Sequence, residues 1–218
     1  MALYVQYGCG FCAPKEWQNY DASLTLRAER IPVFGSFIKK NVSRFPPNVL
    51  SGDIVRGLPV PDGMADAVYA SHVLEHLSRE DFGLALRNTW RILTPGGVFR
   101  LIVPDLEARA RSYLKRLEAG QANSNDWFMS VSSLGMEKKP AGFISLFASI
   151  FGASHHLWMW DWPSMKAALD MAGFTSIRRC ERGDSGDPMF NLVEEASRFY
   201  DDNQHIRELA VHCVKPPA

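Results

Sequence analysis

The chain has 218 residues, of which 46% are hydrophobic, and its 24 lysines and arginines balance 24 aspartates and glutamates. This length and composition suit one α/β domain with a sizeable core, and the zero net charge makes a nucleic-acid partner unexpected. The most apolar stretch, residues 143–151, is too short to cross a bilayer, and the first residues lack a signal-peptide pattern. We therefore expect a cytoplasmic protein with no membrane partner.

The first half of the chain alternates short apolar runs with turns and one clear helical pattern. Strands are predicted at residues 3–7, 17–21, 48–53, 65–71 and 98–104. A helix is predicted to begin at Ser78, with Asp81 completing a variant capping box, and to end at the Pro-Gly-Gly turn of residues 95–97. Its apolar face is expected to hold Phe82, Ala85, Leu86, Trp90 and Leu93. Such alternation predicts a mostly parallel sheet with helices on both faces.

The second half is predicted to contain an insertion and then a return to the α/β pattern. Residues 106–160 break the alternation, so we expect residues 1–218 to form a single domain with a lid-like insertion there. The insertion is expected to begin with a helix at 106–120, and the domain to close with a helix at 163–173 and strands at 174–181 and 206–215. A basic run on the first of these helices is expected to be a solvated face: Arg109, Arg111, Lys115 and Arg116.

The stretch YGCGFC, residues 7–12, allows three interpretations. Cys9 and Cys12 have the spacing of a redox dithiol or of half a zinc site, but Cys180 and Cys213 each stand alone on a predicted strand. The stretch can also be a tight turn with two incidental thiols. The third interpretation is a glycine turn that lets the backbone approach a nucleotide, and it assigns no metal ligand.

The residues that follow favour the glycine turn. The first predicted strand runs into Gly8-x-Gly10, the second ends at Asp21 and the third ends at Asp53. Ligands of an open α/β sheet bind outside the carboxyl ends of its strands. A carboxylate at the second strand can grip two ribose hydroxyls, and one at the third can accept from an adenine amino group. The pattern indicates a nucleoside-bearing cofactor at this edge.

The motifs VQYGCG, WQNYD, SGDIVRGLPVPDGMADAVYASHVLEHL and RILTPGGVFRLIVPD, taken in order, resemble class I S-adenosylmethionine-dependent methyltransferases. They are most similar to the small bacterial type-11-like group, and HHLWMWDWPSMKAALDMAGF is similar to the stretch before that group's last helix. The resemblance implies a Rossmann-like, mostly parallel seven-stranded sheet with an antiparallel last strand. It also implies S-adenosylmethionine as the cofactor.

The family's cofactor-binding roles fall on residues at the strand ends. The resemblance places the methionine part beside the turn of Tyr7, Gly8, Cys9 and Gly10, the ribose at Asp21, the adenine at Asp53 and Ile54, and the sulfonium at Ser71 and His72. The chain departs from the family at Gln6, where an acid is common, and at Cys12, where a third glycine is usual. Few residues separate Gly10 from Trp17, so the usual first helix is expected to be missing or reduced to a turn.

Histidines are the candidate catalytic residues, because a hydroxyl acceptor needs a base of near-neutral pKa. His72 is one candidate, and His155 and His156 could reach the site from the insertion. Each has a plainer alternative: His72 can hydrogen-bond the cofactor or the backbone, and the other two can hold the insertion to the sheet. Glu75 with His76 can likewise be a capping and packing pair or a catalytic dyad, and Asp105 can line the acceptor pocket or cap a helix.

The insertion also concentrates aromatic side chains, which are expected in packing and can stack on sugars or planar acceptors. They are Trp127, Phe128, Phe143, Phe147, Phe151, Trp158 and Trp160. The predicted function is methyl transfer to a small-molecule or sugar-like (glycan-like) acceptor. The alternative is a protein of the same fold that binds S-adenosylmethionine or a nucleotide without catalysis, motivated by the short glycine region.

Overall fold

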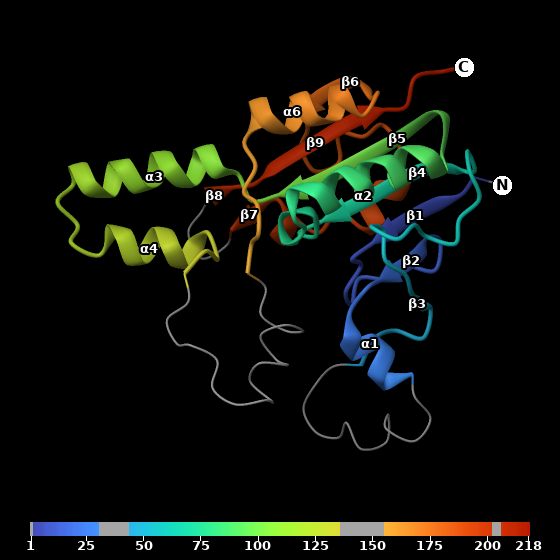
Figure 1. Ribbon diagram of the computed structural model, residues 1–218, viewed down its shortest axis with the longest axis horizontal. Coiled ribbons are helices and arrows are strands. Elements are labelled where there is room, and N and C mark those ends of the chain that lie inside the picture. Colours follow the sequence, from blue (N-terminus) through green and yellow to red (C-terminus); the bar gives the residue numbers. More distant parts are fainter. Residues whose placement is uncertain (1, 31–43, 136–154, 202–205) are drawn as a thin grey trace.

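A seven-stranded sheet organises the protein, which we describe from a computed structural model covering residues 2–30, 44–135, 155–201 and 206–218 (Figure 1). The strand order is β3-β2-β1-β4-β5-β9-β6. The strands are β1 (Tyr4–Tyr7), β2 (Gln18–Asp21), β3 (Val49–Ser51), β4 (Ala65–Ser71), β5 (Leu93–Val103), β6 (Thr175–Arg179) and β9 (Leu209–Val214). The first five are parallel, and β9 runs antiparallel to both of its neighbours. The predicted seven-stranded, mostly parallel sheet with an antiparallel last strand is confirmed.

The remaining elements connect or extend this sheet. The helices are α1 (Leu24–Glu29), α2 (Arg79–Ile92), α3 (Leu106–Glu118), α4 (Ser124–Val131) and α6 (Trp162–Met171). Short 3-10 turns are η1 (Leu74–His76), η2 (Pro188–Leu192) and η3 (Ala196–Arg198), and β7 (Tyr200–Asp201) pairs with β8 (Ile206–Arg207) in a separate sheet. Ser78 caps α2 by accepting the Asp81 amide at 3.1 Å, as the sequence predicts. α6 begins at a capping box of Asp161 and Ser164.

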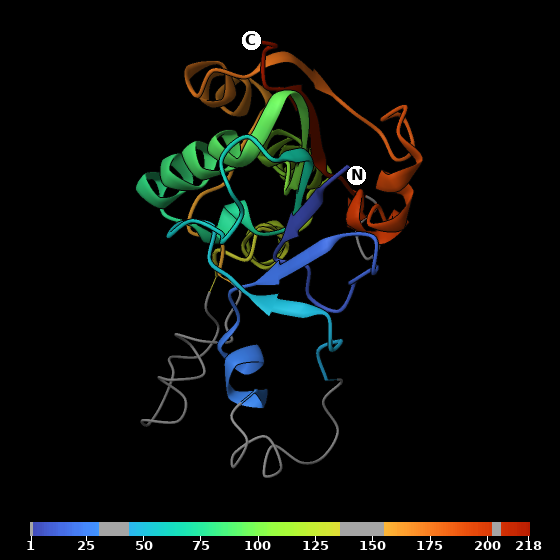
Figure 2. The same ribbon diagram turned by 90° about the vertical axis from the view of Figure 1, so that its right-hand side faces the viewer.

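Helices α2 and α6 cover one face of the sheet (Figure 2). Phe99 and Leu101 of β5 point into the main core on this face. There they meet Phe82 and Leu86 of α2 and Leu169 of α6, and all five side chains are nearly inaccessible to solvent. Burial of apolar side chains at this density is the main stabilising contribution to such a fold.

The chain between β6 and β9 covers the other face of the sheet, on the right of Figure 2 in orange-red. No helix separates β1 from β2, in agreement with the sequence-based expectation. Instead, Phe190 packs edge-on against Trp17 and Tyr69, with ring centroids 5.4 and 6.5 Å away. Arg100 of β5 is 1% exposed on this face, and its Nε donates to Glu194 at 2.6 Å. The excursion after β6 thus occupies the space that a helix after β1 would fill.

The structure differs from the sequence predictions at two boundaries and in the orientation of one side chain. Helix α2 ends at Ile92 and β5 begins at Leu93, so the Pro-Gly-Gly of residues 95–97 lies inside the strand, where pairing with β4 shifts register. Trp90 is 37% exposed and lies off the buried face of α2, with Lys215 Nζ 3.9 Å from its ring centroid. The last predicted strand is split at Glu208 into β8 and β9.

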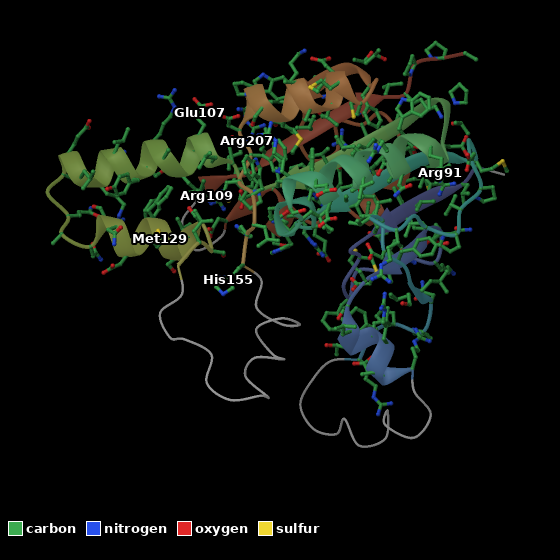
Figure 3. All side chains as sticks on the ribbon, in the orientation of Figure 1. Arg91, Glu107, Arg109, Met129, His155 and Arg207 are labelled. Atoms are coloured by element: carbon green, nitrogen blue, oxygen red, sulfur yellow. The ribbon has the colours of Figure 1, made fainter. Side chains whose placement is uncertain are left out.

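The interpretation of the basic run on α3 as a solvated face is wrong for Arg109. This side chain is buried, and its two terminal nitrogens donate to the Glu208 carboxylate at 2.7 and 2.9 Å. It lies at the end of α3 that meets the sheet (Figure 3). Because Glu208 directly precedes β9, this bidentate pair ties α3 to the sheet, whereas Arg111 on the same helix is exposed.

We expect Arg109→Ala to lower the free energy of unfolding by about 3–5 kcal/mol, because it leaves the Glu208 carboxylate buried without a counter-charge. Arg111→Ala is the matched control, since it removes an exposed ion pair with Glu107 from the same helix and is expected to cost less than about 1 kcal/mol. Chemical denaturation measures both. Equal costs for the two variants would show that the buried pair does not hold α3 in place.

Candidate functional site

The turn after β1 brings the backbone unusually close to the start of η1. Gly8 has φ +64°, and a Cβ at this position would lie 2.0 Å from Val73 Cγ2. Only glycine fits, for both steric and conformational reasons. The next residue is fixed as well, because the Cys9 amide donates to the Tyr20 carbonyl at 3.1 Å. The β1 turn is therefore held in one position at the carboxyl edge of the sheet.

Gln6 explains the first departure from the methyltransferase pattern. Its buried side-chain amide donates to the Cys12 carbonyl at 2.7 Å and to Asn19 Oδ1 at 2.5 Å. A carboxylate could not donate these two bonds. Gln6 thus holds the short 8–17 loop in place where the loop contains no helix.

Asp21 at the end of β2 holds the same loop. Its two carboxylate oxygens accept from the Gly10 amide at 3.0 Å and from the Ser23 amide at 2.8 Å. Each oxygen keeps a lone pair, so the group can still accept from a ligand hydroxyl. The predicted ribose residue and the glycine turn are therefore in direct contact.

Asp53 lies two residues beyond β3, beside Asp21, since the Gly52 amide donates to the Asp21 carbonyl at 3.1 Å. One Asp53 oxygen accepts from the Val55 amide at 2.9 Å. The Ile54 side chain is 4% exposed and belongs to the main core. Asp53 thus lies at the strand-end edge with Asp21, and the adenine-contacting roles of Asp53 and Ile54 stay predictions.

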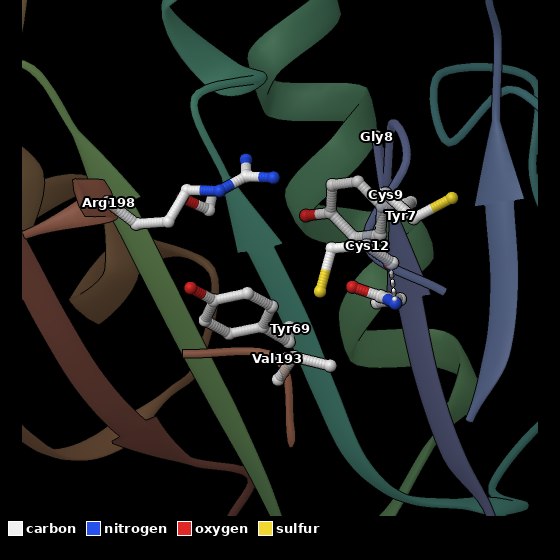
Figure 4. Close-up of a pocket in the computed structure, with 9 residues that line it drawn as sticks. Tyr7, Gly8, Cys9, Cys12, Tyr69, Val193 and Arg198 are labelled. Carbon is white, nitrogen blue, oxygen red and sulfur yellow. Dashed lines mark hydrogen bonds between the residues drawn. The ribbon is translucent and has the colours of Figure 1, made fainter. Parts of the chain in front are cut away.

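A small pocket joins the ends of β1 and β4 (Figure 4). It is narrow and partly open to solvent. Its lining consists of Gln6, Tyr7, Gly8, Cys9, Cys12, Tyr69, Ser71, Val193 and Arg198. Ser71 Oγ is buried there without a protein partner in hydrogen-bonding geometry. Four predicted cofactor residues therefore meet at one pocket.

Sequence reasoning missed Val193 and Arg198, which close this pocket from the excursion after β6. The Arg198 side chain reaches across toward the β1 turn (Figure 4), and its Nε lies 3.3 Å from Glu195. No local motif marks either residue, because they reach the site through the long-range packing of residues 181–199. The strand-end pattern alone could not have indicated them.

His72 follows β4 in a left-handed conformation, φ +55°, which is rare for a residue with a side chain and is often found at functional sites. Its Nε2 lies 3.0 Å from the Arg198 carbonyl and its Nδ1 lies 3.4 Å from Glu75 Oε1. Burial lowers the pKa of His72, but the Glu75 carboxylate and the Arg198 carbonyl raise it, and the net shift is upward. Both ring nitrogens face protein groups.

The structure places the other two predicted histidines in different surroundings. His156 lies with Glu75 and His76 in a cluster whose potential ligand atoms are all within 4.8 Å of one another. Burial lowers the pKa of His156, which favours its neutral form. His155 contributes its carbonyl to His76, whereas its ring points away from the sheet where the described chain resumes (Figure 3).

The two remaining predicted roles concern η1 and Asp105. Glu75 and His76 do not cap α2, a role that Ser78 fills. Asp105 caps α3, because its Oδ1 accepts from the Glu107 and Ala108 amides, and Arg179 lies 3.1 Å from its other oxygen. Of the two sequence-based alternatives for Asp105, the capping one is seen.

Neither cysteine of the C-x-x-C pair has the properties of a redox thiol. Burial raises the pKa of Cys9 to about 12 and raises that of Cys12 as well. All four cysteines are free. A thiol held protonated is a poor nucleophile and a poor metal ligand. The observations count against the redox-dithiol interpretation and are compatible with either of the two turn interpretations.

A larger groove lies between α2 and α6, with a volume of about 530 Å³. Trp158 and Trp160 line it with Phe82, whose ring centroid lies 4.1 Å from that of Trp160. Trp127 lies elsewhere, under Arg116, and Phe128 packs on Tyr113. Phe143, Phe147 and Phe151 lie outside the described residues. The insertion therefore contributes aromatic faces to a groove that adjoins η1 through the Trp158 amide and the Glu75 carbonyl.

Comparison with known proteins supports the resemblance seen in the motifs. Residues 5–101 match the family model described as a methyltransferase domain, and no curated protein matches. A SAM-dependent methyltransferase from Thermotoga maritima is similar at 15% identity and a TM-score of 0.51, over 99% of this chain and 83% of its own. One from Archaeoglobus fulgidus has 15% identity and a TM-score of 0.48, over 98% of this chain and 86% of its own. The family-model match confirms the resemblance to methyltransferases over residues 5–101, and the Thermotoga maritima structure shares the fold.

Among residues 2–30, 44–135, 155–201 and 206–218, no helix has the length and apolar character needed to cross a membrane.

We expect Gly8→Ala to be clearly more damaging than Gly10→Ala, although both positions have positive φ. The added methyl group at Gly10 meets nothing within 4 Å, whereas at Gly8 it collides with Val73. Positive φ alone costs about 1 kcal/mol or more, and the collision adds about 1–3 kcal/mol. Thermal or chemical unfolding of the two variants measures the difference. If they unfold alike, the close approach of the turn to η1 is not a constraint.

Proposed function

We propose that this protein transfers a methyl group from S-adenosylmethionine to a small-molecule or sugar-like acceptor. The observation that carries the proposal is the pocket in which the Gly8 turn meets the buried Ser71 and Tyr69 hydroxyls at the carboxyl edge of the sheet. In sheets of this type the cofactor lies at that edge. The methyltransferase-domain match over residues 5–101 covers the same strands.

The residues present fit the three parts of this cofactor. Asp21 has free lone pairs for the ribose hydroxyls, Asp53 stands at the next strand end for the adenine amino group, and Ser71 offers a hydroxyl beside the Gly8 turn. When bound, the cofactor supplies an electrophilic methyl carbon attached to a good leaving group. The protein's contribution is then to hold the acceptor atom on the axis of that bond and to exclude water.

The transfer breaks the sulfur–methyl bond and forms an acceptor–methyl bond, and a hydroxyl acceptor also loses a proton. His72 lies closest to the sulfonium end by sequence, so we propose it as the residue nearest to the chemistry. Its two ring nitrogens are engaged by Glu75 and the Arg198 carbonyl, and accepting a proton requires one of these contacts to open. The catalytic roles of His155 and His156 stay predictions.

The aromatic groove supports the acceptor class. Trp158 is 38% exposed in the groove, one backbone hydrogen bond from η1, and exposed aromatic faces stack on sugar rings and planar molecules. The balanced charge of the chain offers no general attraction for a polyanion.

The narrow pocket is also the observation that favours the second candidate, a protein that binds the cofactor without catalysis. Val193 and Arg198 cover the β1 turn in this narrow pocket, and we propose that residues 193–198 move outward when the cofactor binds. A methyltransferase has to open and close this segment in each turnover, whereas a binding protein needs it to open only once. Turnover with a panel of small hydroxyl and amine acceptors separates the two candidates.

We expect Asp21→Asn to weaken binding of S-adenosylhomocysteine by about ten- to a hundredfold, because hydrogen bonds to a charged acceptor contribute about 1.5–3 kcal/mol. Calorimetric titration measures the affinity, with ATP and NAD as ligands that should not bind. Asp66→Asn is the matched control, since Asp66 also accepts a backbone amide, that of Leu3 at 2.7 Å, at the opposite end of the sheet. Unchanged affinity in Asp21→Asn would remove the ribose assignment.

We expect Arg198→Met to weaken the binding of S-adenosylhomocysteine but not that of methylthioadenosine, which lacks the amino-acid part. The Arg198 guanidinium reaches across the pocket beside the β1 turn, and a guanidinium is the natural partner of a carboxylate (Figure 4). The same calorimetric titration with the two ligands measures the effect. Equal weakening of both ligands would mean that Arg198 only shapes the pocket.

A further inference from the structure

Glu75 is a buried carboxylate that the protein does not satisfy. The residue is 1% exposed, and both of its carboxylate oxygens lie below the surface without a partner in hydrogen-bonding geometry. Burial of a charge is costly unless a counter-charge, a proton or a metal ion is present. The side chain therefore needs a proton, a charged histidine or a metal ion at this place.

His76 presents a nitrogen toward this carboxylate. Its Nδ1 lies 3.1 Å from the His155 carbonyl, which can only accept, so Nδ1 carries the proton. The lone pair of the neutral ring is then on Nε2, which lies 3.8 Å from Glu75 Oε1. A backbone carbonyl that accepts from the other ring nitrogen in this way is the usual support of a metal-binding histidine.

His156 completes the cluster with a second free nitrogen. The Ser132 carbonyl accepts from its ring, while its Nδ1 is buried without a partner. The backbone holds this residue close to Glu75, because the Glu75 carbonyl accepts the Leu157 amide at 2.8 Å and the Trp158 amide at 3.1 Å. The His76 and His156 ring centroids are 5.1 Å apart.

We propose that Glu75, His76 and His156 bind a divalent transition-metal ion such as Zn²⁺. Ions such as Zn²⁺ bind two imidazoles and one carboxylate well, whereas Mg²⁺ and Ca²⁺ prefer oxygen ligands alone. Three protein ligands leave one coordination position open. The ligand atoms lie within 4.8 Å of one another, so bonds of about 2.0–2.2 Å require them to close in by roughly 1 Å. The sequence assigns no metal ligand, because the three residues come from two segments separated by 80 positions.

A protonated histidine is the rival explanation for the charge of Glu75. His72 Nδ1 lies 3.4 Å from Glu75 Oε1, so an imidazolium there could balance the carboxylate without a metal. The two explanations differ in an observable way, because only the metal site saturates with one equivalent of a divalent ion and uses His156.

The test is a titration of the chelator-treated full chain with Co²⁺, followed by its visible absorption, and with Zn²⁺ by calorimetry. We expect saturable 1:1 binding that His76→Ala and His156→Ala each weaken at least about tenfold, the scale by which even indirect supports of a metal act. Glu75→Gln keeps the shape of the side chain and is expected to weaken binding similarly.

Two variants serve as matched controls. His155→Ala removes the neighbouring imidazole but keeps the carbonyl that orients His76, and binding should be unchanged. Cys12→Ser should also leave metal binding unchanged. Loss of metal binding in this variant would assign the metal to the cysteine pair instead. Circular dichroism checks that each variant is folded.

The metal proposal fails if the wild-type chain shows no saturable 1:1 binding, or if His155→Ala and His156→Ala bind alike. It is independent of the proposed methyl transfer, because titration of S-adenosylhomocysteine into the metal-free chain tests the cofactor pocket separately.

Discussion

A guanidinium buried against the sheet is the interaction on which the site-bearing half of the structure depends. Arg100 projects from β5 on the face covered by the chain after β6, where its nitrogens donate to Glu194, to Asp184 at 2.8 Å and to the Glu181 carbonyl at 2.8 Å. Burial alone raises the pKa of Asp184, but hydrogen bonds from Arg178 and Arg100 lower it to about 2. A buried charge of this kind is tolerated only when its partners are held in place. The chain after β6 must therefore return to this face.

The return of the chain to this face also shapes the pocket at the carboxyl edge of the sheet. The excursion packs Phe190 against Trp17 and Tyr69, and the turn that follows brings Val193 and Arg198 over the Gly8 turn and Ser71. In a sheet with a helix after β1, that helix would support the glycine loop. Here Gln6 and Asp21 support the loop from inside the sheet. The short loop is thus stabilised by polar side chains and covered by a distant segment.

The sequence predicts what is local and periodic. The strands, the Ser78 cap, the helices at α3 and α6 and the strand-end acids each follow from a few adjacent residues, and all are found. The burial of Arg109 could not be predicted in this way, because its exposed neighbours on α3 have the same charge and its partner Glu208 is 99 residues away. The same holds for Val193 and Arg198, which carry no periodic signal. Ion pairs between residues that are far apart in the chain cannot be predicted from the sequence pattern, because the fold determines which residues meet.

The segment from Ser71 to His76 links the two sites. Ser71 lines the pocket, His72 adopts its left-handed conformation one residue later, and η1 then directs Glu75 and His76 to the histidine cluster. The contacts form a continuous chain, since Glu75 Oε1 lies 3.4 Å from His72 Nδ1 and His72 Nε2 lies 3.0 Å from the Arg198 carbonyl. The pocket and the histidine cluster therefore share one short segment of the chain, in which His72 contacts the Glu75 carboxylate on one side and the carbonyl of pocket-lining Arg198 on the other.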